Sequence, residues 1–280
     1  MTPPVWGAPR RPGMGEIVRA VRPGPVFGGL VVVAVVGGWL CARAEPGRNG
    51  EAVGGTILLV LAGWVISLCL HEFAHAVTAF RFGDRNTEVR GYLTLNPLRY
   101  THTGLSIGLP LLIILLGGIG FPGGAVYVQQ AGFSRAERTT VSLAGPATNL
   151  AIGAILLGVV AAFGSTDGTW MTGGLLIGSD HIVLWAALAM LAFLQITAAI
   201  LNLIPMPGFD GYGAIEPYLS DQTRVSANKI APYGFLIVFA LLFIPALNKA
   251  FFDGIYALFE LSGVPSELSS YGWYLFAFWR

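Results

Sequence analysis

The sequence predicts an all-α polytopic membrane protein with about five to six transmembrane helices. Of its 280 residues, 54% are hydrophobic and only 11% are charged, whereas a soluble domain carries about 25% charged residues. Several apolar runs also approach the roughly 20 residues that a helix needs to cross the hydrocarbon core. The expected surroundings are therefore a lipid bilayer. A net charge of +1 provides no field that would attract nucleic acid, so we expect no such partner.

The apolar runs define the expected elements in chain order. They cover residues 26–42, 53–80, 104–121, 141–163, 182–204 and 233–261. We therefore expect a single transmembrane domain over residues 26–262, with a core of about 53–212. An N-terminal segment (1–25) precedes it and an aromatic C-terminal tail (263–280) follows it. We expect the tail to be an interfacial anchor and consider a plug over the active-site cleft the weaker alternative.

The arginines predict how the chain crosses the cell membrane. Four of them precede the first apolar run and four follow the second: Arg10, Arg11, Arg19, Arg22, Arg81, Arg85, Arg90 and Arg99. Cytoplasmic loops are enriched in Lys and Arg. The N-terminus and the far end of the second run are therefore expected on the cytoplasmic side of this multi-pass protein.

The third apolar run, residues 104–121, is the exception. Arg99 precedes it and Arg135 follows it, and Pro110 and several glycines interrupt it. These features favour a re-entrant segment that returns to the cytoplasmic side, which is tolerated where protein or water surrounds the backbone. Residues 125–128 then predict a small β element near the active site, and an extended peptide could pair with the edge around Val126.

The last run, residues 233–261, leaves two alternatives open. Pro245, Asn248, Lys249 and Asp253 interrupt it. It is either one kinked helix or a spanning helix followed by an interfacial one.

The second apolar run contains the sequence His-Glu-Phe-Ala-His over residues 71–75. On a helix, His71 and His75 project from one face about 6 Å apart, which suits one tetrahedral zinc. Glu72 can then reach a zinc-activated water as general base. The alternative is a structural polar cluster between helices. However, a Glu in a membrane helix costs about 2–3 kcal/mol, and such a cost usually marks function.

The distance between the motif and the nearest arginine predicts how deep the metal lies in the membrane. His75 lies six residues before Arg81, so the metal would sit about 9–15 Å below the cytoplasmic interface. Hydrolysis at that depth predicts an aqueous cleft open to the cytoplasm.

The candidates for a third protein ligand are His102, His181, Asp210 and Glu216. Asp210 stands out because prolines and glycines break the chain just before it, which allows a carboxylate to turn toward the metal.

Three motifs together resemble a known family. Residues 71–75, Ala-Gly-Pro-Ala-Thr-Asn at 144–149 and the run from Asn202 to Gly211 occur in the order seen in the site-2 protease family of intramembrane zinc metalloproteases. Residues 83–97 resemble its compact bacterial branch, which lacks a PDZ insertion. The sequence departs from that branch at Tyr100, His102 and Thr103, and at the Gly-Phe pair before Asp210.

The resemblance implies a role for each motif. One zinc per chain would be bound by His71, His75 and Asp210, with Glu72 as general base and acid. Asn149 would face the site and bind the substrate carbonyl or the oxyanion, although an interhelical hydrogen bond is an equal alternative. The expected function is hydrolysis of peptide bonds in membrane-protein or membrane-peptide substrates. The alternatives are a membrane protein that binds or transports a metal, and an inactive scaffold.

Overall fold

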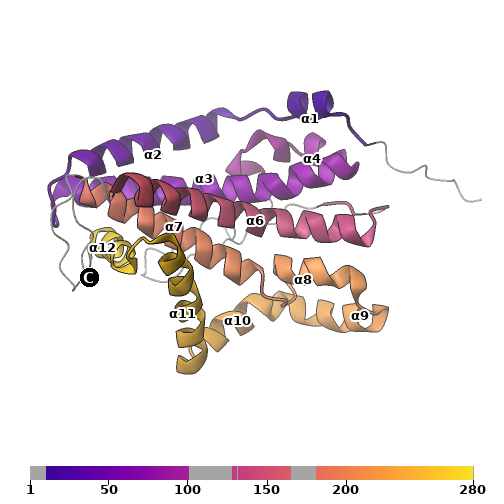
Figure 1. Cartoon of the computed structure of the whole chain (residues 1–280). Coiled ribbons are helices and arrows are strands. Elements are labelled where there is room, and N and C mark those ends of the chain that lie inside the picture. Colours follow the sequence, from indigo (N-terminus) through magenta and orange to yellow (C-terminus); the bar gives the residue numbers. More distant parts are fainter. Residues whose placement is uncertain (1–10, 101–127, 131, 165–180, 280) are drawn as a thin grey trace, which may run out of the picture.

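A computed structural model describes residues 11–100, 128–130, 132–164 and 181–279. Within these residues the secondary structure is helical throughout, with no strand (Figure 1). The expected all-α polytopic architecture is thereby confirmed. The re-entrant segment at 104–121, His102 and Val126 of the expected β element lie outside the described residues.

Among the described residues, five helical stretches are long and apolar enough to cross a membrane. They are α2 (Pro25–Arg43), α3 (Gly50–Phe82), α6 (Arg135–Val159) with the π-helical turn η4 (Val160–Gly164), α7 (Ile182–Asn202) and the stretch Asp221–Leu242. The last stretch comprises α9 (Asp221–Ile230), η6 (Ala231–Tyr233) and α10 (Gly234–Leu242). The first four agree with predicted apolar runs to within about six residues at each end.

Shorter helices gather mainly at the two ends of the bundle. α1 (Met14–Ala20), α4 (Asn86–Val89), η1 (Tyr92–Thr94), η2 (Pro97–Arg99), α8 (Asp210–Ile215) and η5 (Glu216–Tyr218) lie near the end of α3 that carries its C-terminus (Figure 1). α11 (Pro245–Ser262) and α12 (Ser266–Phe276) complete the chain.

Local sequence signals set the ends of the two helices that build the site. The Asn49 side chain accepts a hydrogen bond from the Ala52 backbone N–H at 2.9 Å and so caps the start of α3. α3 ends at Phe82, and the capping residue Gly83 has a φ of 113°, which suits a residue without a Cβ. Ser134 and Glu137 form a capping box at the start of α6.

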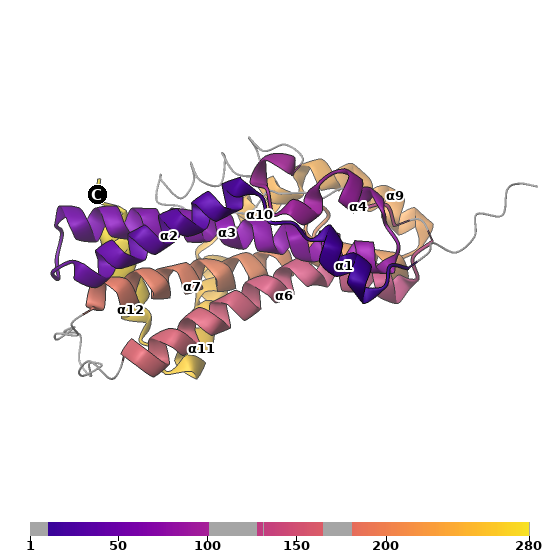
Figure 2. The same ribbon diagram turned by 90° about the horizontal axis from the view of Figure 1, so that it is seen from above.

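α7 lies at the centre of the bundle. In the most apolar 18 residues of α7, 83% of the residues are buried, against 11% in the corresponding part of α2. α2 therefore lies at the periphery of the bundle. α3 and α6 run beside α7 in both views (Figures 1 and 2). Small residues permit close approach: a Cβ added to Gly55 of α3 would lie 2.9 Å from the backbone nitrogen of Cys41 in α2.

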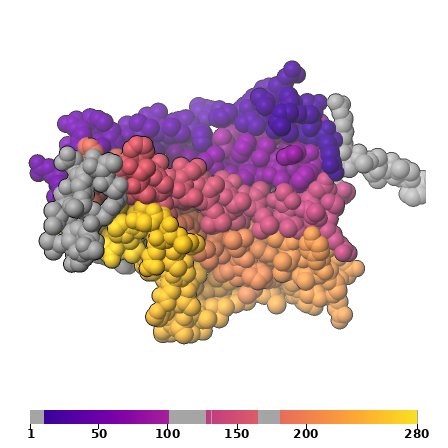
Figure 3. Space-filling view, viewed as in Figure 1, coloured from indigo at the N-terminus to yellow at the C-terminus, as the bar shows by residue number. Residues whose placement is uncertain are grey.

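The last apolar run is divided into two helices. α10 ends at Leu242, and Pro245 begins α11, because proline lacks an N–H and fits the first turn of a helix. The Asn248 amide donates to the Leu242 carbonyl at 3.0 Å and satisfies a group at the break. α11 then crosses the bundle direction and stands out from the body of the molecule (Figures 1 and 3).

The aromatic C-terminal tail forms α12, at the end of the bundle where α3 and α7 begin (Figure 1). The Tyr271 hydroxyl accepts a hydrogen bond from Gly47 N–H at 2.8 Å. Arg48 donates to the carbonyls of Tyr274 and Ala277 at 2.8 and 3.0 Å. α8 lies at the other end of the bundle, so the alternative of a plug over the cleft near Asp210 is wrong.

Candidate metal centre

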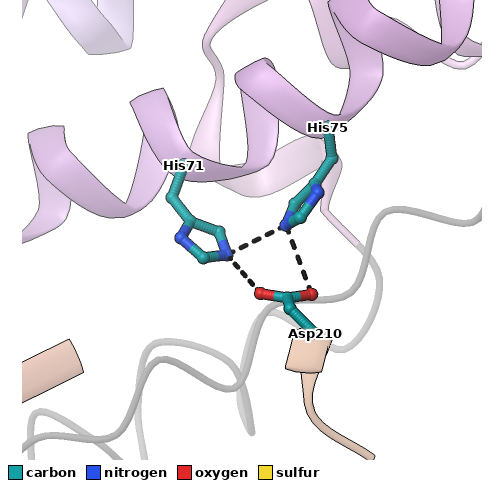
Figure 4. Close-up of side chains that lie close together, drawn as sticks. All are labelled: His71, His75 and Asp210. Atoms are coloured by element: carbon teal, nitrogen blue, oxygen red, sulfur yellow. Dashed lines mark hydrogen bonds and ion pairs between the residues drawn. The ribbon is translucent and has the colours of Figure 1, made fainter. Parts of the chain in front are cut away.

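α3 presents two imidazoles side by side (Figure 4). His71 and His75 lie one turn apart, and their Nε2 atoms are 3.0 Å from each other. Both side chains are buried, at 3% and 8% residue exposure. The second ring nitrogen of His75, Nδ1, lies 2.6 Å from the backbone carbonyl oxygen of Val141 in α6. A backbone acceptor at that position orients the ring and leaves Nε2 available as a ligand.

Asp210 approaches the imidazoles from the first turn of α8. Its Oδ2 atom is 3.2 Å from Nε2 of His71, and its Oδ1 atom is 3.4 Å from Nε2 of His75 (Figure 4). Burial would raise the pKa of the Asp210 carboxyl, but His75 and His71 outweigh burial and hold this pKa well below its usual range. The carboxylate is therefore ionised at neutral pH, the form that ligates a metal.

The backbone between α7 and α8 turns tightly to aim this carboxylate. Gly208 has a φ of +103°, which residues with a side chain rarely adopt. A Cβ on Gly211 would overlap the Leu203 carbonyl, and a Cβ on Gly234 of α10 would overlap the Pro207 carbonyl. The loop thus folds back on α7 and packs against α10.

The three side chains fit a metal ion. One donor atom from each of His71, His75 and Asp210 lies within 4.8 Å of the others, and two imidazoles with one carboxylate are a donor set typical of catalytic zinc. A Cβ added to Gly145 of α6 would overlap Nε2 of both histidines. The glycine therefore leaves space at the point where the donor atoms converge. Within the described residues, Nδ1 of His71 is buried without a hydrogen-bond partner.

α6 also holds α8 in place. The Thr139 hydroxyl donates to the Ala214 carbonyl at 2.7 Å, and Arg138 lies 3.7 Å from the Glu216 carboxylate. A Cβ on Gly213 would lie 2.7 Å from Oγ of Ser142. These contacts connect the helix beside the histidines to the helix that carries Asp210.

Glu72 and Asn149 are both buried, one on α3 and the other on α6. Glu72 lies between the two histidines in the sequence of α3 and is 2% exposed. Asn149 is 3% exposed and lies one turn after Gly145 on the same face of α6. Its Oδ1 atom is buried with no hydrogen-bond partner in the described part of the chain, so nothing there supports the alternative of an interhelical bond through this oxygen.

His181 and Glu216, two of the other candidate ligands, make contacts elsewhere and do not join His71, His75 and Asp210. His181 lies at the start of α7, and its Nδ1 atom is 2.8 Å from the Ala42 carbonyl oxygen. Glu216 is engaged by Arg138 and Arg224 at 3.7 and 3.5 Å. His102 lies outside the described residues.

Sequence reasoning did not anticipate the contact roles of Gly145 and Val141. Gly145 belongs to the motif at 144–149, which the sequence connects to function only through the family resemblance. A glycine beside Pro146, inside an apolar helix and at helical spacing from Asn149, is the signal that could have pointed to a close helix approach.

Comparisons with known proteins identify the family of the chain. The chain matches peptidase family M50 over residues 59–245. It is 50% identical over 261 residues to a protein of Mycolicibacterium smegmatis named "Putative zinc metalloprotease Rip2", covering 93% of this chain and 96% of the relative. The Rip2 of Mycobacterium tuberculosis strain H37Rv is 47% identical over the same shares. YwhC of Bacillus subtilis is 33% identical over 191 residues, which cover 66% of this chain and 80% of YwhC.

These relatives and the apolar helices define the class: the protein is a multi-pass membrane zinc metalloprotease. More narrowly, the chain belongs to peptidase family M50, as the predicted resemblance to site-2 proteases implied. No solved structure matches it.

Proposed function

We propose that the protein cleaves peptide bonds of membrane-protein substrates within the membrane, with His71, His75 and Asp210 holding the zinc. The observation that carries this proposal is the convergence of Asp210 with His71 and His75, because both histidines lie on a helix long and apolar enough to span the bilayer. Charged and imidazole side chains in such a helix are costly and usually functional. A soluble substrate would not require chemistry at that depth.

Zinc, when bound, supplies a Lewis acid that polarises the scissile carbonyl and activates water. Glu72 accepts a proton from the attacking water and delivers it to the departing amine. The position of Glu72 next to His71, buried at 2% exposure, supports this role because a proton acceptor must stand beside the ligands. Asn149 offers a buried side-chain amide one turn from Gly145, and we assign it to hydrogen bonding with the substrate carbonyl or the oxyanion.

The peptide must be extended to be cut, because helical hydrogen bonding shields the scissile carbonyl. We propose that residues 125–128, including Val126, form a short strand that pairs with this extended peptide. The backbone N–H of Gln129 donates to Asp84 at 2.8 Å, just beyond the end of α3. This contact supports the proposal because it ties the chain that follows Val126 to the helix that carries the histidines.

For the orientation, we propose a cytoplasmic N-terminus and an active site reached by water from the cytoplasmic side. Arg81 and Arg85 lie at or just beyond the C-terminal end of α3, whereas Arg19 lies in α1 and Arg22 two residues after its end (Figure 1). All four are at the end of the bundle where α8 carries Asp210, as the positive-inside rule requires for a cytoplasmic end.

Glu72→Gln tests the mechanism in purified full-length protein. We expect zinc content equal to that of the wild type, and a fall in kcat of about 10²–10⁴-fold on a membrane-peptide substrate. Wild-type cleavage by Glu72→Gln would refute the role of Glu72. To test cleavage within the membrane, the products from a substrate reconstituted in vesicles are mapped by mass spectrometry. Cuts restricted to its water-exposed ends would refute intramembrane action.

A further inference from the structure

Tyr100 is a buried tyrosine that reaches the helix of the candidate metal centre. It is 3% exposed, and its hydroxyl donates to the Cys69 carbonyl of α3 at 3.0 Å. The two residues are 31 positions apart in sequence, so this is a tertiary contact. The Tyr100 ring lies beside that of Tyr92, with 6.3 Å between the ring centroids.

Helix geometry places this hydroxyl beside the turn that carries Glu72. The carbonyl of residue i in an α-helix points along the axis toward residues i+3 and i+4, here Glu72 and Phe73. Cys69 and Glu72 also share one side of α3, three residues apart. In agreement, burial above all, and then Cys69 and Glu72, raise the pKa of the Tyr100 phenol above its ordinary value. The phenol therefore stays protonated and remains a hydrogen-bond donor at neutral pH.

The segment that carries Tyr100 is anchored apart from this contact. The Arg22 and Gly24 backbone N–H groups donate to the carbonyls of Leu93 and Thr94 at 3.2 and 2.8 Å. The Asn96 side chain accepts from Leu98 N–H at 3.0 Å and caps η2. These hydrogen bonds hold the segment in place without the Tyr100–Cys69 contact. The Tyr100 hydroxyl can therefore restrain the position of α3.

We propose that Tyr100 is a positioning residue for Glu72: its hydrogen bond to Cys69 fixes the helix turn from which Glu72 acts. This inference rests on the proposed function, in which Glu72 exchanges protons with water and the leaving amine. Proton transfer and attack depend on geometry, and a misplacement of about 1 Å can cost about 10²-fold in rate. The Tyr100 hydroxyl bonds a backbone carbonyl rather than a donor atom of His71 or His75, so we expect its removal to leave the zinc ligands in place.

Tyr100→Phe in the full-length protein tests the proposal, because it removes one oxygen and keeps the ring. We expect kcat to fall by about tenfold or more, KM to change by less than about twofold, and zinc content to equal that of the wild type. Tyr92→Phe is the matched control: it removes the same atom from the other ring of the pair, which does not bond Cys69. We expect Tyr92→Phe to retain wild-type kcat.

A purely structural role predicts a different pattern. Tyr100→Phe would then lower the thermal unfolding midpoint but leave kcat per folded, zinc-loaded molecule unchanged, and that result would overturn the proposal. Glu72→Asp provides a second measurement, since it displaces the carboxylate. Combined with Tyr100→Phe it should give less than the product of the two single effects on kcat, because both act on one position. Independent, multiplicative effects would contradict the proposal.

The two proposals fail in distinguishable ways. If the wild-type protein cuts and Glu72→Gln does not, while Tyr100→Phe cuts at the wild-type kcat, only the role of Tyr100 is wrong. If Glu72→Gln cuts as fast as the wild type, the proposed mechanism itself is wrong.

Discussion

Gly145→Ala should weaken zinc binding although all three ligands are still present. It therefore tests the space around the ligands more directly than replacement of a ligand does. A methyl group at this position would stand closer than 3.0 Å to Nε2 of His71 and of His75. Non-bonded heavy atoms normally approach to about 3.5 Å. The imidazoles or the α6 backbone must therefore move by up to about 1 Å, whereas metal–ligand distances tolerate only about 0.2 Å.

The expected loss of zinc affinity follows from the cost of forcing an extra carbon into a packed interior, about 1–3 kcal/mol. If this cost appears in the metal-bound form, zinc binds about 5- to 150-fold more weakly. The measurement is a chelator competition with detergent-purified protein at neutral pH, accompanied by the unfolding midpoint. Activity at saturating zinc should also fall, because the ligand geometry is altered.

Gly158→Ala is the matched control in the same helix. A Cβ at Gly158 meets nothing within 4 Å, and alanine favours a helix over glycine by up to about 1 kcal/mol. This variant should bind zinc normally and unfold at the same or a higher temperature. Wild-type zinc affinity and activity in Gly145→Ala would refute the close approach of α6 to the imidazoles.

Two further predictions concern the third ligand and a buried amide. Asp210→Ala should weaken zinc retention far more than His102→Ala, by at least about tenfold, as measured by metal content after dialysis; the reverse ranking would refute the ligand assignment. Both polar atoms of the Gln195 side chain in α7 are buried without a partner in the described part of the chain, so Gln195→Leu should stabilise the protein by about 1–3 kcal/mol. Thr197→Val, which removes another buried oxygen without a partner among the described residues, should also stabilise; a lower unfolding midpoint in Gln195→Leu would refute the prediction.

Apolar periodicity and composition are sufficient to predict the membrane-spanning helices. Apolar runs of about 20 residues predict spanning helices because the bilayer leaves an unsatisfied backbone no alternative. The same reasoning could not choose between one kinked helix and two helices after residue 233. That choice depends on whether another group satisfies the carbonyls left without helical partners where α10 ends. The Asn248 amide does so for Leu242, and such a pairing is visible only in three dimensions.

For the candidate site, the sequence by itself determined the two imidazoles and Glu72, because a five-residue motif on one helix carries its own geometry. It favours Asp210 over His181 and Glu216 through the prolines and glycines that break the chain before Asp210, and through the family resemblance. The tertiary structure decided that Asp210 meets both Nε2 atoms, that Gly145 leaves room for them, and that Tyr100 bonds the adjoining turn. These contacts join residues up to 139 positions apart. Local periodicity reports which face of a helix is apolar, whereas the packing of α3 against α6 and α8 determines what meets that face.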